Sequence, residues 1–261
     1  MKDIALVCCY NNTEMYSNIL KKTLANQKNI DYELIGIDNS DNMFPSAASA
    51  LNYGIEKSDS EYIIVVHQDF EFINEDALAS FLQYSKQFND NDILGVAGAI
   101  LDDSAKILKR FIGRNRIIYS SLIDSTNRVK GFKKVESLDE CCFGFKRSFW
   151  EKHPFDEIAC DKWDLYAVDM CLEADRNNGG VYVIPIDSLH HSGGNITKNF
   201  YKSLNNLMKK YEKDKKKIIT TCVVSDTRHP DFECLKLNLI NEVRMRRKSC
   251  LLYTSDAADE L

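Results

Sequence analysis

Residues 62–69 read Tyr-Ile-Ile-Val-Val-His-Gln-Asp, so an uninterrupted apolar run is followed directly by three polar residues. A short run of this kind is typical of a strand buried on both faces, as strands of parallel sheets are. Ligands of open α/β sheets bind at the carboxyl ends of the strands. This stretch therefore predicts the fold class, and it places His67, Gln68 and Asp69 where a ligand would bind.

On both sides of this stretch, short apolar runs alternate with segments of helical periodicity, the pattern of β-α-β units. Further strands are expected at 4–9, 32–38 and 181–186, and the apolar run 93–100 continues the pattern; helices are expected at 13–27, 46–57, 75–88, 163–177, 200–217 and 235–248. The sequence thus predicts an α/β fold with a mainly parallel, Rossmann-like sheet flanked by helices and followed by C-terminal helices.

The chain is long enough for one large α/β domain with a helical extension. We expect residues 1–100 to form a nucleotide-binding half and residues 101–200 an acceptor and catalytic half. Within the second half, residues 102–135 are polar with broken periodicity, as in the loops that often wall a site. Residues 201–250 are expected to form the helical extension. Residues 251–261 have no periodicity, so we interpret them as a non-native tail and leave them out of fold reasoning.

Charge and cysteine content exclude some classes of protein. The net charge is −5, and three of these charges come from the predicted tail, which leaves a near-neutral body unlike that of a general nucleic-acid binder. The nine cysteines include the adjacent pairs Cys8-Cys9 and Cys141-Cys142 and form no C-x-x-C motif. This pattern favours free thiols in a reducing cytoplasm over disulfides or a structural zinc site.

The length of the apolar runs and the distribution of charge both bear on membrane attachment. No leader is apparent, and no apolar run approaches the 18 residues of a membrane span. The lysine-rich run 209–217 usually indicates a solvated helix face, although a basic helix can also lie on anionic lipid. We expect a cytoplasmic protein, with peripheral membrane contact left open.

Two strand ends carry acids that suit a phosphorylated ligand. Asp69 can hold Mg²⁺ or Mn²⁺, which would bridge diphosphate oxygens and neutralise the charge on a leaving nucleotide. Asp38 and Asn39 end the second strand, where they can contact a base or ribose or form an Asx turn. The first strand is followed by Tyr10-Asn11-Asn12 and not by G-x-G-x-x-G, which disfavours a dinucleotide-binding Rossmann domain.

Two further groups of residues are candidates for chemistry. Asp164 and Asp169 lie five residues apart at the start of an expected helix, where acids favour the helix dipole. One of them can instead be the general base that deprotonates an acceptor hydroxyl. His190 and His191 follow the last expected strand, and a neutral imidazole there can bind a metal such as Mn²⁺.

The order of these motifs resembles that of family-2-like glycosyltransferases of the GT-A fold, in particular a bacterial subgroup whose metal motif is His-Gln-Asp. The resemblance covers residues 4–199 and rests on Tyr10-Asn11-Asn12, Ile37-Asp38-Asn39-Ser40, Ala50-Leu51-Asn52-Tyr53-Gly54, Val66-His67-Gln68-Asp69, Phe155-Asp156-Glu157, Trp163 to Leu172, and Val183-Ile184-Pro185 with His190-His191-Ser192. Two positions depart from the commoner pattern. His67 replaces the first acid of the metal motif, and Tyr166-Ala167 replaces a Glu-Asp pair.

This resemblance implies roles for individual residues. The nucleotide pocket would include Asp38 on the base or ribose, with Asn11, Asn39, Asn52 and Gln68. Asp69, with His67, would bind Mn²⁺ or Mg²⁺ on the donor diphosphate. His190, or alternatively His191, would complete the metal contacts, and Asp164 or Asp169 would be the base.

The implied activity is inverting transfer of a sugar from a nucleotide-sugar, with a UDP-sugar as first choice, to a glycan or glycoconjugate acceptor, in surface polysaccharide or glycoconjugate synthesis. A non-catalytic nucleotide- or carbohydrate-binding GT-A module is the alternative. A nucleotidyltransferase is disfavoured, because residues 10–14 contain no Gly-rich phosphate loop with Lys or Arg.

Overall fold

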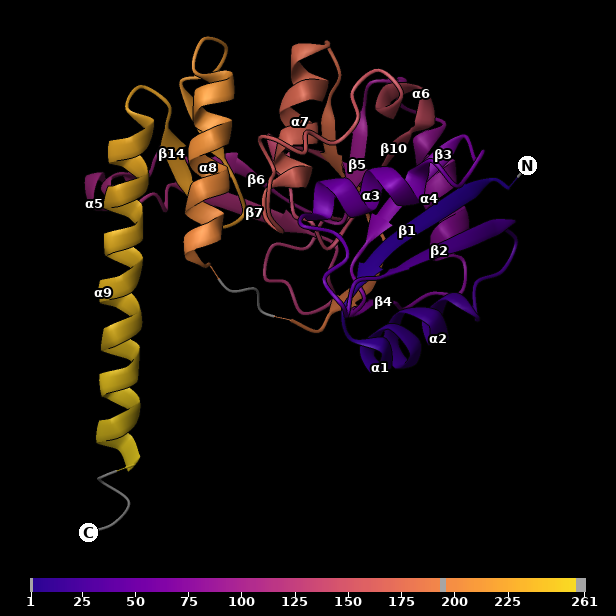
Figure 1. Ribbon diagram of the computed structural model, residues 1–261, viewed down its shortest axis with the longest axis horizontal. Coiled ribbons are helices and arrows are strands. Elements are labelled where there is room, and N and C mark those ends of the chain that lie inside the picture. The colour runs from indigo at the N-terminus through magenta and orange to yellow at the C-terminus, as the bar shows by residue number, and fades with distance from the viewer. Residues whose placement is uncertain (1, 193–195, 257–261) are drawn as a thin grey trace.

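The computed structural model describes residues 2–192 and 196–256 (Figure 1). Its centre is a seven-stranded sheet. In spatial order the strands are β2 (Tyr32–Asp38), β1 (Ile4–Tyr10), β3 (Tyr62–Val66), β10 (Cys142–Lys146), β5 (Ile93–Gly95), β11 (Val181–Val183) and β8 (Lys133–Lys134). All run in one direction except β10 and β8. The predicted mainly parallel α/β fold is confirmed.

Helices cover both faces of this sheet. Successive residues of a strand point to opposite faces, so the apolar strands present apolar side chains on both, and each face packs against helices. Ala5 and Val7 of β1 pack in one apolar cluster, and Ile4 and Leu6 pack in another. The first cluster includes α3 (Ala47–Ile55), α6 (Arg147–Trp150), α7 (Tyr166–Arg176) and α8 (Lys198–Tyr211); the second includes η1 (Tyr16–Lys21, a π-helix), α2 (Lys22–Leu24) and α4 (Ala77–Ser85).

The expected helices form, with small changes at their ends. Residues 13–24 are helical throughout, from α1 (Thr13–Met15) through η1 to α2. Ser46 caps α3 by accepting a hydrogen bond from the Ser49 amide at 3.2 Å. The predicted helix 200–217 is too long at its C-terminal end, since α8 ends at Tyr211 and Lys217 starts a strand. Amide groups of Asp214 and Lys215 bond the Tyr211 carbonyl and turn the chain.

Three smaller sheets surround the central one. β6 (Ala97–Leu101), β7 (Arg116–Ser120) and β9 (Ser137–Leu138) form the first, β4 (Phe70–Phe72) and β12 (Ser188–His190) the second, and β13 (Lys217–Ile219) and β14 (Val224–Asp226) the third. The apolar run 93–100 therefore divides at Val96 between two sheets. The segment 102–135 is loops together with α5 (Ile107–Phe111), β7 and β8.

The C-terminal segment packs at the end of the molecule far from β2, where α8 and α9 (Pro230–Asp256) run side by side (Figure 1). Leu204, Leu207, Tyr211 and Leu237 from this segment belong to the same apolar core as β1. α9 reaches Asp256, so it includes part of the segment 251–261, interpreted above as a non-native tail; residues 257–261 lie outside the described chain. Each helix in the described chain is too short or too polar to cross a lipid bilayer.

Candidate active site

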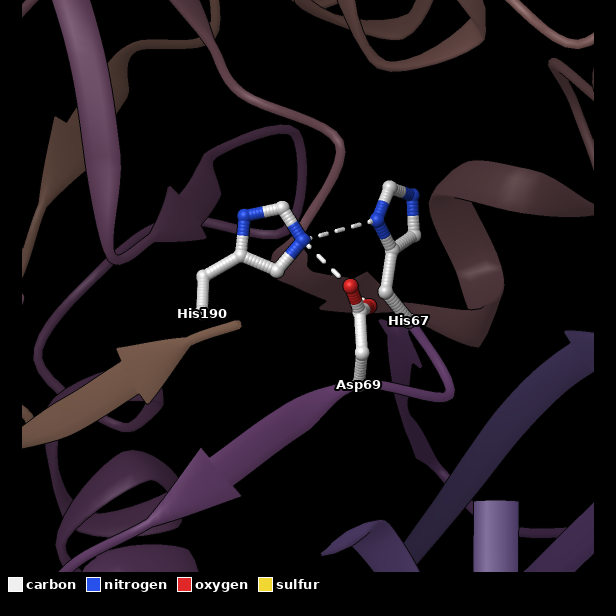
Figure 2. A group of neighbouring side chains, drawn as sticks. All are labelled: His67, Asp69 and His190. Carbon is white, nitrogen blue, oxygen red and sulfur yellow. Dashed lines mark hydrogen bonds and ion pairs between the residues drawn. The ribbon is translucent and has the colours of Figure 1, made fainter. Parts of the chain in front are cut away.

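A cluster of two histidines and one aspartate lies at the carboxyl end of β3 (Figure 2). His67 and Asp69 occupy the turn between β3 and β4. His190 ends β12 and pairs with Phe70 in the β4–β12 ladder, which brings it beside Asp69. The Nε2 atom of His190 lies 3.3 Å from Nδ1 of His67 and 3.4 Å from Oδ1 of Asp69. Motif residues that lie far apart in the sequence therefore meet at one point.

The cluster is electrostatically asymmetric. Burial lowers the pKa of His67, and the charge of His190 lowers it further, so His67 is neutral at pH 7. Burial alone would lower the pKa of His190, but the hydrogen bond and the charge of Asp69 outweigh this effect, so the pKa of His190 is raised. At Asp69, burial is likewise outweighed by His190 and Ser192, and its pKa lies well below the usual range. The site thus holds an ionised carboxylate beside two ring nitrogens.

The donor set of this cluster fits a divalent metal. One oxygen and two nitrogen ligand atoms lie within 4.8 Å of one another. Imidazole suits transition metals, whereas Mg²⁺ prefers an all-oxygen shell. Of the two predicted ions, the residues present favour Mn²⁺ over Mg²⁺.

A pocket of about 440 Å³ opens directly beside the cluster. Its polar lining comes from the ends of the first three strands, and its apolar lining from α3 and the start of α7; it includes Tyr10, Asn11, Asn39, Leu51, His67, Gln68, Asp69, Trp163, Tyr166 and Ser192. Such a concave site at the carboxyl ends of parallel strands is where a nucleotide would bind.

Gln68 connects the metal motif to the first strand end. Its Oε1 accepts hydrogen bonds from the amides of Asn11 and Asn12 at 3.1 and 2.9 Å, and its Nε2 donates to Oδ1 of Asn11 at 3.1 Å. Asn39 is also held in place, since its amide group bonds the backbone of Phe44 in both directions. The pocket wall predicted from Asn11, Asn39 and Gln68 is therefore held in place by hydrogen bonds within the protein.

Asp38 is exposed at the end of β2 and does not line the pocket. Its Oδ1 accepts from the amide of Ser40 at 2.9 Å and from the Ser40 hydroxyl at 2.6 Å, the Asx turn weighed above. The carboxylate also forms a hydrogen bond with the Tyr10 hydroxyl, and Tyr10 lines the pocket, so Asp38 borders the pocket through Tyr10.

Asn52 does not contribute to the nucleotide pocket, in contrast to the prediction. Its Nδ2 donates to the Phe155 carbonyl and to Glu157, and its Oδ1 accepts from the Trp150 indole and the Phe155 amide, all at 2.9 to 3.0 Å. These four bonds use the whole hydrogen-bonding capacity of the side chain. Asn52 therefore joins α3 to the segment after α6 and is not available to a ligand.

The two candidate bases occupy different environments. Asp164 is half-buried between Trp163, which lines the pocket, and Leu165, which has a left-handed φ of 70°. Burial raises the pKa of Asp164, which moves it towards the range useful to a general base. The left-handed backbone of Leu165 is strained for a residue with a side chain, and backbone strain of this kind is frequent at functional sites.

Asp169 faces away from the pocket, which corrects its assignment as a candidate base. Its buried carboxylate accepts hydrogen bonds from Nζ of Lys210 and from the hydroxyl of Tyr211, both at 2.8 Å. Both partners lie on α8, so Asp169 fastens α7 to α8. A carboxylate enclosed in this way cannot reach an acceptor hydroxyl.

His191 is likewise outside the cluster. Its Nε2 lies 2.7 Å from Oε2 of Glu71, and the side chain is exposed. Between the two histidines that sequence reasoning left open, the fold places His190 in the cluster with His67 and Asp69, because adjacent residues at a strand end point in opposite directions.

Sequence reasoning missed Tyr166, Asp139 and Glu140. The Tyr166 hydroxyl lies 3.0 Å from Nε2 of His67 and fixes the ring. Asp139 and Glu140 precede β10, and since β10 runs antiparallel to β3, its start lies at the carboxyl end of β3. The signal was an acidic pair before the apolar run 141–145, but strand direction could not be read from the sequence.

Glu140 is a half-buried acid whose carboxylate accepts hydrogen bonds from the amides of Leu165 and Tyr166 at the start of α7. Its Oε1 is buried and has no hydrogen-bond partner among the described residues. Burial, with the charges of Asp139 and Asp164, raises its pKa well above the usual range. A buried, perturbed carboxyl group beside a pocket is a feature of functional sites.

Comparison with known families agrees with this geometry. The sequence model of the Glycosyltransferase like family matches residues 5–221, a range that contains every residue of the cluster and of the pocket lining. No curated protein matches the chain. The match extends past α8 and β13 to residue 221. A match over most of the chain, on a mainly parallel α/β fold of the GT-A kind, shows that this chain belongs to the Glycosyltransferase like family.

Proposed function

We propose that the chain transfers a sugar from a nucleotide-sugar, with a UDP-sugar as the first candidate, to a hydroxyl of a glycan or glycoconjugate, with inversion at the anomeric carbon. The observation that carries the proposal is the cluster of His67, Asp69 and His190 beside a pocket at the strand ends. In a member of a glycosyltransferase family, the pocket would hold the nucleotide of the donor, and the cluster would hold a metal on its diphosphate.

The donor would lie with its nucleoside in the pocket and its diphosphate towards the cluster. Asn11, Asn39 and Gln68 present polar atoms at the pocket wall, and the stacked rings of Tyr10 and Tyr16 support that wall from below. Asp38 borders the rim and would contact the base or ribose from outside. We retain these residues as donor contacts and leave Asn52 out.

His67, Asp69 and His190 would hold the ion, which when bound supplies positive charge to the departing diphosphate. Tyr166 orients His67 through its 3.0 Å contact with Nε2. This leaves Nδ1 of His67 directed at His190, where the ion would sit. His191 has no part in this site.

Asp164 would act as the general base. The acceptor oxygen forms a bond to the anomeric carbon while the bond from that carbon to the diphosphate oxygen breaks, and the diphosphate leaves with the electron pair. Asp164 takes the proton of the acceptor hydroxyl. Trp163 is exposed beside Asp164 and lines the pocket, so its ring is placed to pack against an acceptor sugar.

We place this reaction in the cytoplasm. The eight cysteines whose side chains the structure describes are free thiols, which suits a reducing compartment. Peripheral membrane contact gains no support from the lysine-rich run, because Lys209, Lys210 and Lys215 are paired with Asp231, Asp169 and Asp175. A role in surface polysaccharide or glycoconjugate synthesis rests on the resemblance alone.

The test is turnover of a panel of UDP-, GDP- and dTDP-sugars by the purified chain with Mn²⁺, measured as release of nucleoside diphosphate. The proposal expects one donor class to be hydrolysed slowly without acceptor and faster with a mixture of glycan acceptors. A non-catalytic binding module would bind nucleotide without release, and this result would contradict the proposal. Asp69→Asn is the matched control for metal-dependent turnover.

A further inference from the structure

The short helix α5 presents its apolar side chains to solvent. None of its five residues is buried, and Ile107, Leu108 and Phe111 are 85, 70 and 58% exposed. Single exposed apolar residues are ordinary on a protein surface, but several together mark a site of interaction with a protein or a membrane. These three side chains add little to the core, so they are available to a partner.

The outer face of α9 carries further exposed apolar residues. Spacings of three, four and four residues place them on one side of the helix, and each is more than half exposed: Phe232, Leu235, Leu239 and Val243. Cys234 and Leu237 lie on the opposite side of α9 and belong to the core. α9 is therefore apolar on two faces, of which the described chain covers only one.

α5 and the start of α9 adjoin at the end of the molecule far from β2 (Figure 1). Nζ of Lys236 on α9 lies 5.4 Å from the centre of the Phe111 ring on α5. Arg110 and Phe232 line the same pocket. The exposed apolar residues of the two helices therefore form one patch, which we call the α5–α9 surface: Ile107, Leu108, Phe111, Phe232, Leu235, Leu239 and Val243.

Basic residues accompany the α5–α9 surface. The segment 102–116 contains five basic residues and two acids, which leaves a net charge of +3. Four of the basic residues lie in or beside α5: Lys106, Lys109, Arg110 and Arg114. Within the described residues, Lys106, Lys109 and Arg114 have no ion-pair partner. Apolar and basic side chains together on one exposed surface are the combination by which helices bind anionic lipid.

A pocket of about 330 Å³ between α5 and α9 has room for a phosphate group. The charged residues of its lining are four cations and two acids: Arg110, Lys217, Arg228 and Lys236, with Asp226 and Glu233. Each acid is already paired, Asp226 with Arg228 at 2.6 Å and Glu233 with Lys236 at 2.5 Å. The charges of the other two cations are therefore left for an anion such as the phosphate of a lipid headgroup.

We propose that the α5–α9 surface docks on an anionic lipid bilayer. Its apolar side chains enter the boundary between headgroups and acyl chains, and the basic residues contact lipid phosphates. A bilayer fits this surface better than a second copy of the chain does. In a two-fold dimer the same patch meets itself, so unpaired cations would face one another, and like charges across an interface are unfavourable. The proposal is independent of the metal site and of the proposed reaction.

Flotation of the whole purified chain with lipid vesicles tests the proposal. We expect binding to vesicles that contain phosphatidylglycerol, little binding to phosphatidylcholine alone, and weaker binding as salt screens the charges. The triple variant Ile107→Ser, Leu108→Ser and Phe111→Ser should bind anionic vesicles at least about tenfold more weakly, because it removes the apolar side chains that enter the bilayer. Ile158→Ser is the matched control and should bind like wild type, since Ile158 is 87% exposed but follows Asp156 and Glu157.

The double variant Lys106→Gln with Lys109→Gln tests the charge separately. It keeps the apolar residues and should weaken binding to anionic vesicles by at least about tenfold at low salt, and by much less at high salt. Lys22→Gln with Lys86→Gln is its control, because these two lysines are also exposed but lie in α2 and at the end of α4. The control should bind like wild type.

Three results would overturn the proposal. The first is equal or absent binding to anionic and neutral vesicles, and the second is a triple variant that binds like wild type. The third is a dimer in analytical ultracentrifugation that the triple variant dissociates, which would assign the α5–α9 surface to a second copy of the chain. Vesicle binding needs neither metal nor nucleotide, so its result stands whether or not the chain proves to transfer a sugar.

Discussion

Nδ1 of His67 and Nε2 of His190 lie 3.3 Å apart, although 123 residues separate them in the chain. The contact exists because β12 pairs with β4, the strand that starts one residue after Asp69. The two histidines, the intervening carboxylate and the adjacent pocket therefore form one unit at the carboxyl edge of the sheet.

Replacing Asp69 with Asn should abolish metal-dependent activity without unfolding the protein. Asp69 is buried and ionised in the cluster, and its loss removes the charged ligand while keeping the shape. We expect transfer to fall by about a hundredfold or more, since a residue that binds the metal directly matters at least as much as the groups that support it. Turnover and Mn²⁺ titration measure the effect, and thermal melting checks the fold. Full activity in Asp69→Asn would remove the metal assignment.

The two adjacent histidines should behave differently. His190→Ala should weaken Mn²⁺ binding strongly, because its Nε2 belongs to the cluster. His191→Ala should leave it nearly unchanged, since that ring pairs with Glu71 and is exposed. Parallel Mn²⁺ titrations of the two variants make the comparison. Equal losses would show that the strand end is placed differently from the structure.

Asp164→Asn should lower the rate of transfer and leave donor binding intact. A positioned general base contributes roughly a hundredfold to ten-thousandfold, so kcat should fall by that order while nucleotide affinity stays the same. Single-turnover kinetics with equilibrium binding separates the two effects. Glu140→Gln is the comparison, because Glu140 is the other acid at the start of α7 whose pKa is raised by burial. Normal kcat in Asp164→Asn together with a large loss in Glu140→Gln would move the role of base to Glu140.

Local patterns were sufficient for the first half of the fold. Residues 62–66 form the predicted strand, because an uninterrupted apolar run rich in β-branched residues suits a strand that is buried on both faces of the sheet. The position of His67, Gln68 and Asp69 at the end of this strand follows from the order of residues in the chain. The position of Asn11 at the end of the first strand follows in the same way. His190 could be placed near it only with the help of the resemblance, since β4–β12 pairing is a long-range event.

What the sequence did not reveal depends on tertiary contacts. Asp169 reads as a helix-start acid, and its partner Lys210 lies on another helix, so its burial was not visible. The direction of β10 decides that Asp139 and Glu140 lie at the site, and a single apolar run carries no direction. Asn52 matched a family motif, but its four bonds to the segment after α6 show that the motif there is structural.

Lys210→Met should destabilise the protein by about 3 kcal/mol or more, because it leaves Asp169 buried without a cation. Urea unfolding measures the change in the free energy of unfolding. The double variant Asp169→Asn with Lys210→Met should recover much of the loss. A change below about 1 kcal/mol in the single variant would contradict the structural role of the pair.

The same pair predicts a loss of stability at high pH. Burial lowers the pKa of Lys210, but the charges and hydrogen bonds of Asp169 and Asp156 outweigh this effect and raise the pKa from 10.5 to about 12. The folded state therefore holds this proton more tightly than the unfolded chain does. The stabilisation is complete below pH 10.5 and is lost as pH rises through about 12. Lys210→Met should show a smaller loss over that interval, and an identical loss would contradict the assignment.

Thermal melting of the purified chain with UDP, GDP and dTDP, each with and without Mn²⁺, tests the claim of a metal-nucleotide site most directly. A ligand that binds only the folded state at a hundred times its Kd adds about 2.7 kcal/mol of stability. For a domain of this size that corresponds to a rise in Tm of roughly 5 to 10 °C. We predict such a rise for one nucleotide, with UDP first, only when Mn²⁺ is present, and its disappearance in Asp69→Asn. No shift with any nucleotide, or a shift that is the same without metal and in Asp69→Asn, would contradict the account.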